Sequence, residues 1–330
     1  MTAALLVGTR KGLFVVRDND VEGPLLPGWE IFHAIARNGT LYAAANNWVY
    51  GATVQRSTDG GQTWERSEPI EGLAKAWHIE PEPEGALWLG GDPACLYRSE
   101  DGGVTWEPNL GILEHPTRDR WNPGAGGLTC HSIQLTPEAF YVAISAAGAF
   151  RSDDAGETWT PINKDVAADF MPDKYPEVGQ CVHKLLAHPA KPGRLWQQNH
   201  CGVYRSDDRG DTWERLDGNG LPSDFGFGIA LDPADPDVAY VIPEQSGEVR
   251  VTTEGQLRVF RTEDGGASWE SWSDGLPAQA WTGVLREATS FDADGVYFGT
   301  QSGSVFSSRG GWRELASQLP TICSVEVTEL

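Results

Sequence analysis

The fold is decided by the stretch Ser57-Thr58-Asp59-Gly60-Gly61-Gln62-Thr63-Trp64, which recurs along the chain. Four close copies lie at 99–106, 152–159, 206–213 and 262–269, and a reduced copy covers 308–312. The aspartates at 59, 101, 154, 208 and 264 are 42, 53, 54 and 56 residues apart. Self-similarity at such a period indicates a protein built from repeated supersecondary units.

Each copy predicts a β-hairpin. Aspartate accepts hydrogen bonds from nearby backbone N–H groups, and the glycines tolerate positive φ, so the Asp-Gly-Gly segment is a tight turn. The threonine and tryptophan that follow resume an extended strand, and the tryptophan can bury a large apolar face. We therefore expect the motif to stabilise a hairpin and to do no chemistry.

The pattern S-x-D-x-G-x-T-W resembles the Asp-box, or BNR repeat, of sialidases, sortilin-type receptors and related β-propellers. The resemblance covers nearly the whole chain and implies fold far more strongly than function. Segments 175–184 and 197–204 also resemble a set of bacterial proteins labelled only as BNR-repeat or sialidase-like. This second resemblance implies that the two segments belong to a functional site, but it implies no particular reaction.

Upstream of each hairpin lie two further apolar strands, so each unit has the four strands of a propeller blade. Six units start near residues 32, 77, 130, 182, 226 and 284. A seventh is split: Leu5–Thr9 and Gly12–Val16 supply two strands, the segment around Trp29 a third, and Ile322–Val327 the innermost. The sequence therefore predicts an all-β, seven-bladed propeller of antiparallel blades, one domain over residues 1–330, closed by its C-terminal strand.

Composition limits the classes of partner. The net charge is -22, from 47 acidic and 25 basic residues, which argues against nucleic acid and anionic membrane as partners. No stretch approaches the roughly 20 apolar residues of a membrane span, and no secretory signal is recognised. The five cysteines form no C-x-x-C pair, and we expect reduced thiols in a cytoplasmic protein. Cys130, Cys181 and Cys201 flank the predicted site, but buried structural cysteines are the favoured interpretation.

Three long connections, at 110–127, 163–180 and 243–256, are expected on the face opposite the Asp-boxes. Long loops in compact domains are often functional. The first residue of each inner strand points toward the channel mouth on that face, which gives His33, His78, His131, His183, Phe227, approximately Glu287, and Cys323. The last residue of each second strand gives Arg10, Asn46, Asp92, Ser145, His200, Glu244 and Gln301.

This convergence suggests a site for a divalent metal, zinc or another transition metal, because imidazole suits these ions and carboxylates lie nearby. Its expected ligands are His33, His78, His131, His183 and His200. The competing interpretation is that these histidines belong to the repeat and hydrogen-bond a neighbouring blade. Residues expected to bind a ligand are Arg10, Asn46, Asp92, Arg120, Trp121, Tyr175, Glu177, Glu244, Glu287 and Gln301.

Three functions remain open at this point. The first is a hydrolase or binding protein for a small polar or carbohydrate-like molecule, in which a metal activates water. The second is a non-catalytic protein-interaction scaffold that uses the loops at 110–127 and 163–180. The third is a glycoside hydrolase of exo-sialidase type. That resemblance implies three arginines gripping a carboxylate and a Tyr–Glu nucleophile pair, for which Tyr175 and Glu177 are candidates, although no F-R-I-P segment is present.

Overall fold

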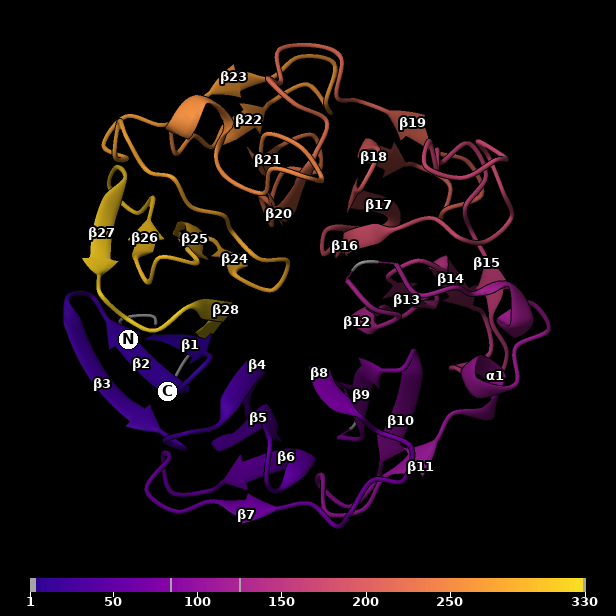
Figure 1. Cartoon of the computed structure of the whole chain (residues 1–330), viewed down its shortest axis with the longest axis vertical. Helices are drawn as coiled ribbons and strands as arrows, with labels where there is room; N and C mark the ends of the chain where they lie inside the picture. Colours follow the sequence, from indigo (N-terminus) through magenta and orange to yellow (C-terminus); the bar gives the residue numbers. More distant parts are fainter. Residues whose placement is uncertain (1–3, 84, 125, 329–330) are drawn as a thin grey trace.

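The computed structural model describes residues 4–83, 85–124 and 126–328. Seven four-stranded antiparallel sheets are arranged around a common axis, as blades of a ring (Figure 1). This confirms the predicted seven-bladed, all-β propeller. The helical segments are short: α1 (Leu110–Leu113), η1 (Arg118–Arg120) and η2 (Thr253–Gly255). Within the described ranges, no helix is long and apolar enough to cross a bilayer.

Each blade runs from an inner strand beside the axis to an outer strand at the rim. Blade 1 contains β28 (Ile322–Thr328), β1 (Ala4–Thr9), β2 (Gly12–Arg17) and β3 (Asp20–Leu25). Blade 2 contains β4 (Glu30–Arg37), β5 (Thr40–Asn47), β6 (Gly51–Ser57) and β7 (Glu65–Arg66). Blade 3 contains β8 (Lys75–Pro81), β9 (Leu87–Asp92), β10 (Cys95–Ser99) and β11 (Glu107–Pro108).

The other four blades follow the same order. Blade 4 contains β12 (Cys130–Leu135), β13 (Phe140–Ile144), β14 (Gly148–Ser152) and β15 (Thr160–Pro161). Blade 5 contains β16 (Val182–His188), β17 (Lys191–Asn199), β18 (Gly202–Ser206) and β19 (Glu214–Arg215). Blade 6 contains β20 (Gly226–Leu231), β21 (Ala239–Pro243), β22 (Phe260–Thr262) and β23 (Glu270–Ser271). Blade 7 contains β24 (Thr289–Asp292), β25 (Gly295–Gly299), β26 (Val305–Ser307) and β27 (Arg313–Ala316).

The ring is closed by the two ends of the chain, as the sequence predicts. Strand β28 pairs antiparallel with β1, in a register that runs from Ala4 opposite Thr328 to Thr9 opposite Ile322. The predicted outer strand of this blade, around Trp29, was wrong, because β3 at Asp20–Leu25 fills that position. The turn before β3 carries no Asp-box to mark it. The inner strand of blade 7 also begins later than expected, at Thr289.

The Asp-box has the structural role that the sequence predicts. Ser57 Oγ donates to Asp59 Oδ1 at 2.8 Å, while the N–H and the hydroxyl of Thr63 donate to the same carboxylate at 2.9 and 2.6 Å. Hydrogen bonds from Thr63 lower the pKa of Asp59 to about 2. Equivalent bonds surround Asp101, Asp154, Asp208 and Asp264. Each carboxylate is therefore committed to its own turn.

In the later copies of the motif, the tryptophan that ends it joins one blade to the one before it, whereas Trp64 and Trp106 bond within their own turns. In blades 5 and 6, the indole N–H of Trp213 donates to the carbonyl of Ile162 at 2.7 Å, and that of Trp269 to Leu216 at 2.8 Å. Both acceptors follow the outer strand of the preceding blade. Both indoles are also buried, so each contributes packing as well as a satisfied hydrogen bond.

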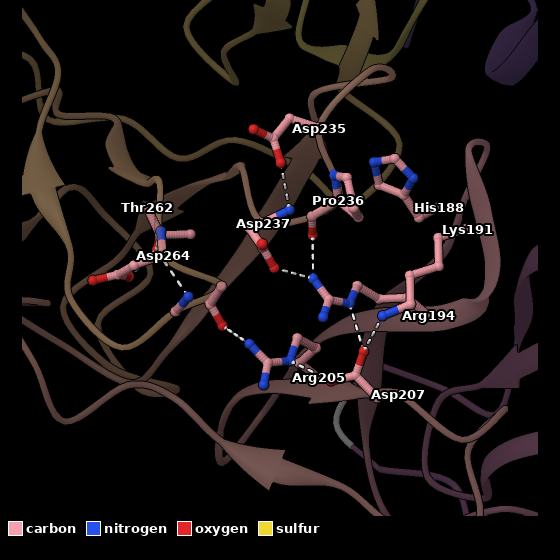
Figure 2. A network of polar contacts seen from close by, with 12 residues as sticks. His188, Lys191, Arg194, Arg205, Asp207, Asp235, Pro236, Asp237, Thr262 and Asp264 are labelled. Carbon is pink, nitrogen blue, oxygen red and sulfur yellow. Dashed lines mark hydrogen bonds and ion pairs between the residues drawn. The ribbon is translucent and has the colours of Figure 1, made fainter.

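A polar network between blades 5 and 6 reinforces this junction (Figure 2). Arg194 donates from Nε to Asp207 at 2.6 Å and from Nη1 to the carbonyl of Pro236 at 2.9 Å, and its side chain is 9% exposed. Arg205 donates to the carbonyl of Gly265, a glycine of the next Asp-box. The Asp-box face is thus occupied by contacts that hold blades together.

Candidate functional site

The repeated histidines lie on the inner strands β4, β8, β12 and β16. A β-bulge interrupts each strand at or next to the histidine: the pairing registers shift between Ile31 and His33, Ala76 and His78, Cys130 and Ser132, and Val182 and Lys184. A bulge re-aims side chains locally. His33, His78, His131 and His183 are all buried, but the expectation that they share one equivalent position is wrong. The residue at the bulge is Phe32, Trp77, His131 and His183 in blades 2 to 5, so His33 and His78 correspond to Ser132 and Lys184. The structure then divides them among different surroundings.

His33 and His78 belong to a buried charged cluster, hereafter the axial cluster, which also contains Lys184, Glu287 and Glu80. The two imidazoles stack with centroids 4.2 Å apart. Glu287 Oε2 lies 3.2 Å from His78 Nδ1 and 2.6 Å from Lys184 Nζ, and His78 Nε2 lies 3.3 Å from Glu80. Glu287 thus connects blade 7 to blades 3 and 5 across the axis.

Electrostatics fix the charges of the axial cluster. Burial alone lowers the pKa of His78, but the Glu287 charge overrides it and raises the pKa to about 9. Burial would raise the pKa of Glu287, yet Lys184 and His78 hold it well below its usual range. Burial and the His78 charge lower the pKa of His33 well below its usual value. The cluster at neutral pH is therefore a carboxylate held between two cations, beside a neutral imidazole.

Hydrogen bonding decides which histidines could hold a metal. Both nitrogens of His78 face carboxylates, and Nδ1 of His33 accepts from the backbone of Ile79 at 3.2 Å. His131 is likewise bonded through both nitrogens, to the Val182 carbonyl at 2.9 Å and to Ser132 Oγ at 3.3 Å. The Lys184 ammonium already neutralises the Glu287 carboxylate at a distance of 2.6 Å. These three histidines serve the blade-to-blade role of the competing interpretation.

His183 and His200 instead meet Cys181, and these three residues of blade 5 are hereafter the Cys-His-His cluster. The sulfur and one nitrogen from each imidazole lie within 4.8 Å of one another. Cys181 and His200 are partly exposed, whereas His183 is buried. His183 Nδ1 donates to the carbonyl of Gly226 in blade 6 at 2.6 Å, which leaves its Nε2 lone pair free.

Arg286 lies close to this cluster, in the segment that leads into β24. Its guanidinium carbon is 5.7 Å from the ring centre of Trp77 and 5.3 Å from that of Phe227, which also stacks on His183 at 4.3 Å. Throughout the described ranges, Arg286 has no ion pair, and its buried Nε has no hydrogen-bond partner. Burial lowers the pKa of Arg286, against the opposing charges of Cys181 and Glu287.

Glu244 lies just beyond β21 and faces the segment that carries Arg286. Its Oε1 accepts from the N–H of Val284 at 3.0 Å, and its buried Oε2 has no partner in the described structure. Burial raises the pKa of this carboxyl to about 7, although the Val284 hydrogen bond and the Arg250 charge oppose the shift. Glu244 can therefore carry a proton at neutral pH.

The other expected ligand-binding residues are spread around the ring. Arg10 pairs with Glu30 at 2.9 Å, and the amide of Asn46 exchanges two hydrogen bonds with the backbone of Ala76. Arg10 and Asn46 line a cavity of about 340 Å³ that Trp48 also borders. Asp92 is the last residue of β9 in blade 3, and Gln301 lies in the turn that follows β25 in blade 7. Neither belongs to blade 5, which contains the Cys-His-His cluster.

The two long loops contain the remaining expected ligand residues. Arg120 pairs with Glu177, whereas Trp121 is buried and donates from its indole to Thr117 at 2.9 Å. Tyr175 is 56% exposed, and no hydrogen bond joins its hydroxyl to Glu177 in the described structure. The Tyr–Glu pair implied by the sialidase resemblance is therefore not assembled here.

Cys181, Lys184 and Arg286 were not among the site residues predicted from the sequence. Cys181 was expected to be structural, yet it is the partly exposed neighbour of His183. The C-x-H spacing was an available signal for their proximity, although Cys181 precedes β16 and a bulge at His183 interrupts the strand alternation. Lys184 and Arg286 carried no signal, because their roles depend on side chains that reach across the axis from other blades.

Fold and repeat together define the chain as an Asp-box β-propeller. A family model for the BNR/Asp-box repeat matches residues 55–66. The chain is 29% identical over 136 residues to the xyloglucanase Xgh74A of Acetivibrio thermocellus, which covers 36% of this chain and 15% of that protein.

Solved structures resemble the chain over almost its whole length. The GH74 xyloglucanase from Xanthomonas campestris superimposes with a TM-score of 0.65 at 18% identity, covering 99% of this chain and 52% of that one. YCF48 bound to D1 peptide superimposes with a TM-score of 0.58 at 15% identity, covering 97% and 90%. The chain thus spans about half the length of the xyloglucanase structure. At these identities the likeness shows the fold alone.

Proposed function

We propose that the protein is a carbohydrate-active hydrolase whose substrate binds at the centre of the ring, on the face that bears the long loops. The observation that carries this proposal is Arg286, a cation without a counter-ion that lies between two aromatic rings. A guanidinium in such a place suits an oxygen-rich or anionic ligand, and flat aromatic faces suit a ring-shaped one. The xyloglucanase relatives support a carbohydrate-like substrate.

In this proposal Glu244 is the proton donor. Its pKa of about 7 keeps a large fraction of the carboxyl protonated at neutral pH, as general acid catalysis requires. Protonation of the oxygen of the leaving group is the step that a glycoside hydrolase assigns to such an acid. Since the acid form is the active one, the rate should fall as the pH rises above 7.

The proposal is tested with a panel of aryl glycosides that includes neutral sugars, uronides and sialosides. Glu244→Gln should lower kcat by about 100-fold or more, and Arg286→Met should raise KM. The matched control is Glu248→Gln, an exposed carboxyl on the neighbouring loop, which should leave both parameters within about twofold. Silence of the wild-type protein across the panel, or equal losses in E244Q and E248Q, would contradict the proposal.

A protein-binding scaffold is the second candidate. Large apolar side chains are exposed on loops of the same face: Phe170 is 52% exposed, Tyr175 56% and Trp281 69%. Exposed aromatic side chains grouped on one face are typical of interaction surfaces. An inactive panel combined with an intact fold would favour this candidate over the hydrolase.

A further inference from the structure

Three potential metal ligands of blade 5, Cys181, His183 and His200, lie close together and are only partly hydrogen-bonded by the protein. In the described part of the chain, neither ring nitrogen of His200 nor Nε2 of His183 has a hydrogen-bond partner, and Cys181 Sγ faces only the backbone N–H of Ala146. By contrast, His78 and His131 are bonded through both ring nitrogens. The protein therefore leaves a sulfur and imidazole nitrogens close together, with lone pairs that a metal ion can use.

The surroundings hold these side chains in orientations that suit coordination. The Gly226 carbonyl fixes the tautomer of His183 through Nδ1 at 2.6 Å, the outer-shell contact that metal-bound histidines usually make. The ring of His200 lies edge-on to Phe170 and Phe225, with centroids 5.3 and 5.1 Å away. These aromatic rings supply packing and no competing hydrogen-bond donor.

We propose that Cys181, His183 and His200 bind one divalent transition metal, zinc or copper, and leave a further coordination position open. One thiolate and two imidazoles suit these metals, and three protein ligands with an open position are typical of catalytic zinc sites. The partial exposure of Cys181 and His200 gives the ion a path of entry.

The distances allow closure of the site. Bonds of about 2.0 to 2.3 Å place tetrahedral ligand atoms about 3.5 Å apart, whereas here they lie within 4.8 Å. The ligand atoms therefore need to approach by at most about 1.3 Å, which small side-chain rotations can provide. On binding, the Cys181 thiol releases its proton to solvent, and the metal–sulfur bond takes the place of the S–H bond.

The axial cluster provides an internal contrast. His33, His78 and Glu287 also lie within 4.8 Å of one another, but Lys184 contacts Glu287 at 2.6 Å and both nitrogens of His78 face carboxylates. There the ligand atoms of Glu287 and His78 are already engaged with each other and with Lys184 and Glu80, whereas Arg286 makes no hydrogen bond to any ligand atom of the Cys-His-His cluster in the described structure. The proposal therefore assigns the metal to the Cys-His-His cluster alone.

The experiment is a titration of the whole, chelator-treated chain with Co²⁺, followed by absorption, and with Zn²⁺ in competition. We expect saturation at one ion per chain, with a thiolate-to-cobalt charge-transfer band. Cys181→Ser should abolish the band, and His200→Ala should weaken affinity at least about tenfold, since loss of an outer-shell partner alone already costs that much. The matched control is Cys201→Ser, which removes a neighbouring thiol and should change neither readout.

Two results would overturn the proposal: the absence of stoichiometric binding by the folded wild-type chain, or a band that persists in C181S. Binding that disappears in His78→Gln while surviving in H200A would move the site to the axial cluster and also refute it. Metal binding is measured without a substrate. A failed glycoside panel therefore leaves this inference standing, and failed metal binding leaves the proposed carbohydrate activity standing.

Discussion

Replacing Glu287 by glutamine should destabilise the ring more than loss of an ordinary ion pair. The side chains of Glu287 and Lys184 are 2% and 8% exposed, and their charged atoms are 2.6 Å apart. The substitution leaves Lys184 buried without its counter-ion and removes one of the two carboxylates that face His78. Breaking a buried pair from one side costs about 3–5 kcal/mol, so we expect a loss of that order in the free energy of unfolding.

Urea denaturation of matched variants measures this loss. Glu65→Gln is the control, because it removes an ion pair of similar length, 2.7 Å to Arg56, from a carboxylate that is 72% exposed. It should cost less than about 1 kcal/mol. The double variant Lys184→Met/Glu287→Gln should recover part of the stability, since the uncompensated ammonium is gone. A loss below about 1 kcal/mol in E287Q, or additive losses in the double variant, would refute the reasoning.

Substitutions in other parts of the ring, and the pH, should also change stability in ways that can be measured. Trp196→Ala should cost about 3–5 kcal/mol in thermal or urea unfolding, because the fully buried indole leaves a cavity, whereas the 95%-exposed Trp48→Ala should change stability by less than about 0.5 kcal/mol. Asp208→Ala should lower the free energy of unfolding by about 1 kcal/mol through lost turn hydrogen bonds. Its metal affinity should be unchanged, because the Asp-boxes lie on the face opposite the Cys-His-His cluster. Because folding raises the pKa of His78, its protonated form contributes fully to the free energy of unfolding below pH 6.5. This contribution is lost as the pH rises through about 9. Unfolding measured across that range should show this loss, and E287Q should diminish it; an identical pH dependence in both proteins would argue against the assigned charges.

The fold could be predicted because the Asp-box is a local chemical unit. Ser57, Asp59, Thr63 and Trp64 make their contacts within one turn, so eight consecutive residues contain the information for a hairpin. Closure by β28 followed from the similarity between the two chain ends and the internal repeats. Strand β3 could not be found in this way, because its turn lacks the motif.

The site was harder to predict, because it depends on contacts between blades. The repeat places His131 and His183 at equivalent positions, but only the structure shows that one is bonded through both nitrogens and the other through one. Arg286 and Glu287 are adjacent in the chain and opposite in role, and they lie in the turn before β24, where no strand alternation predicts their directions. The Glu287 side chain enters the axial cluster, whereas Arg286 lies beside Phe227.

The central claim is that one blade of this propeller supplies a metal-binding triad. X-ray absorption at the zinc edge of the zinc-loaded, full-length protein tests it most directly. The account predicts one sulfur at about 2.3 Å and two imidazole nitrogens at about 2.0–2.1 Å, with a lighter atom completing the shell. A shell without sulfur, or zinc that is removed by simple dialysis and leaves no bound ion, would contradict it.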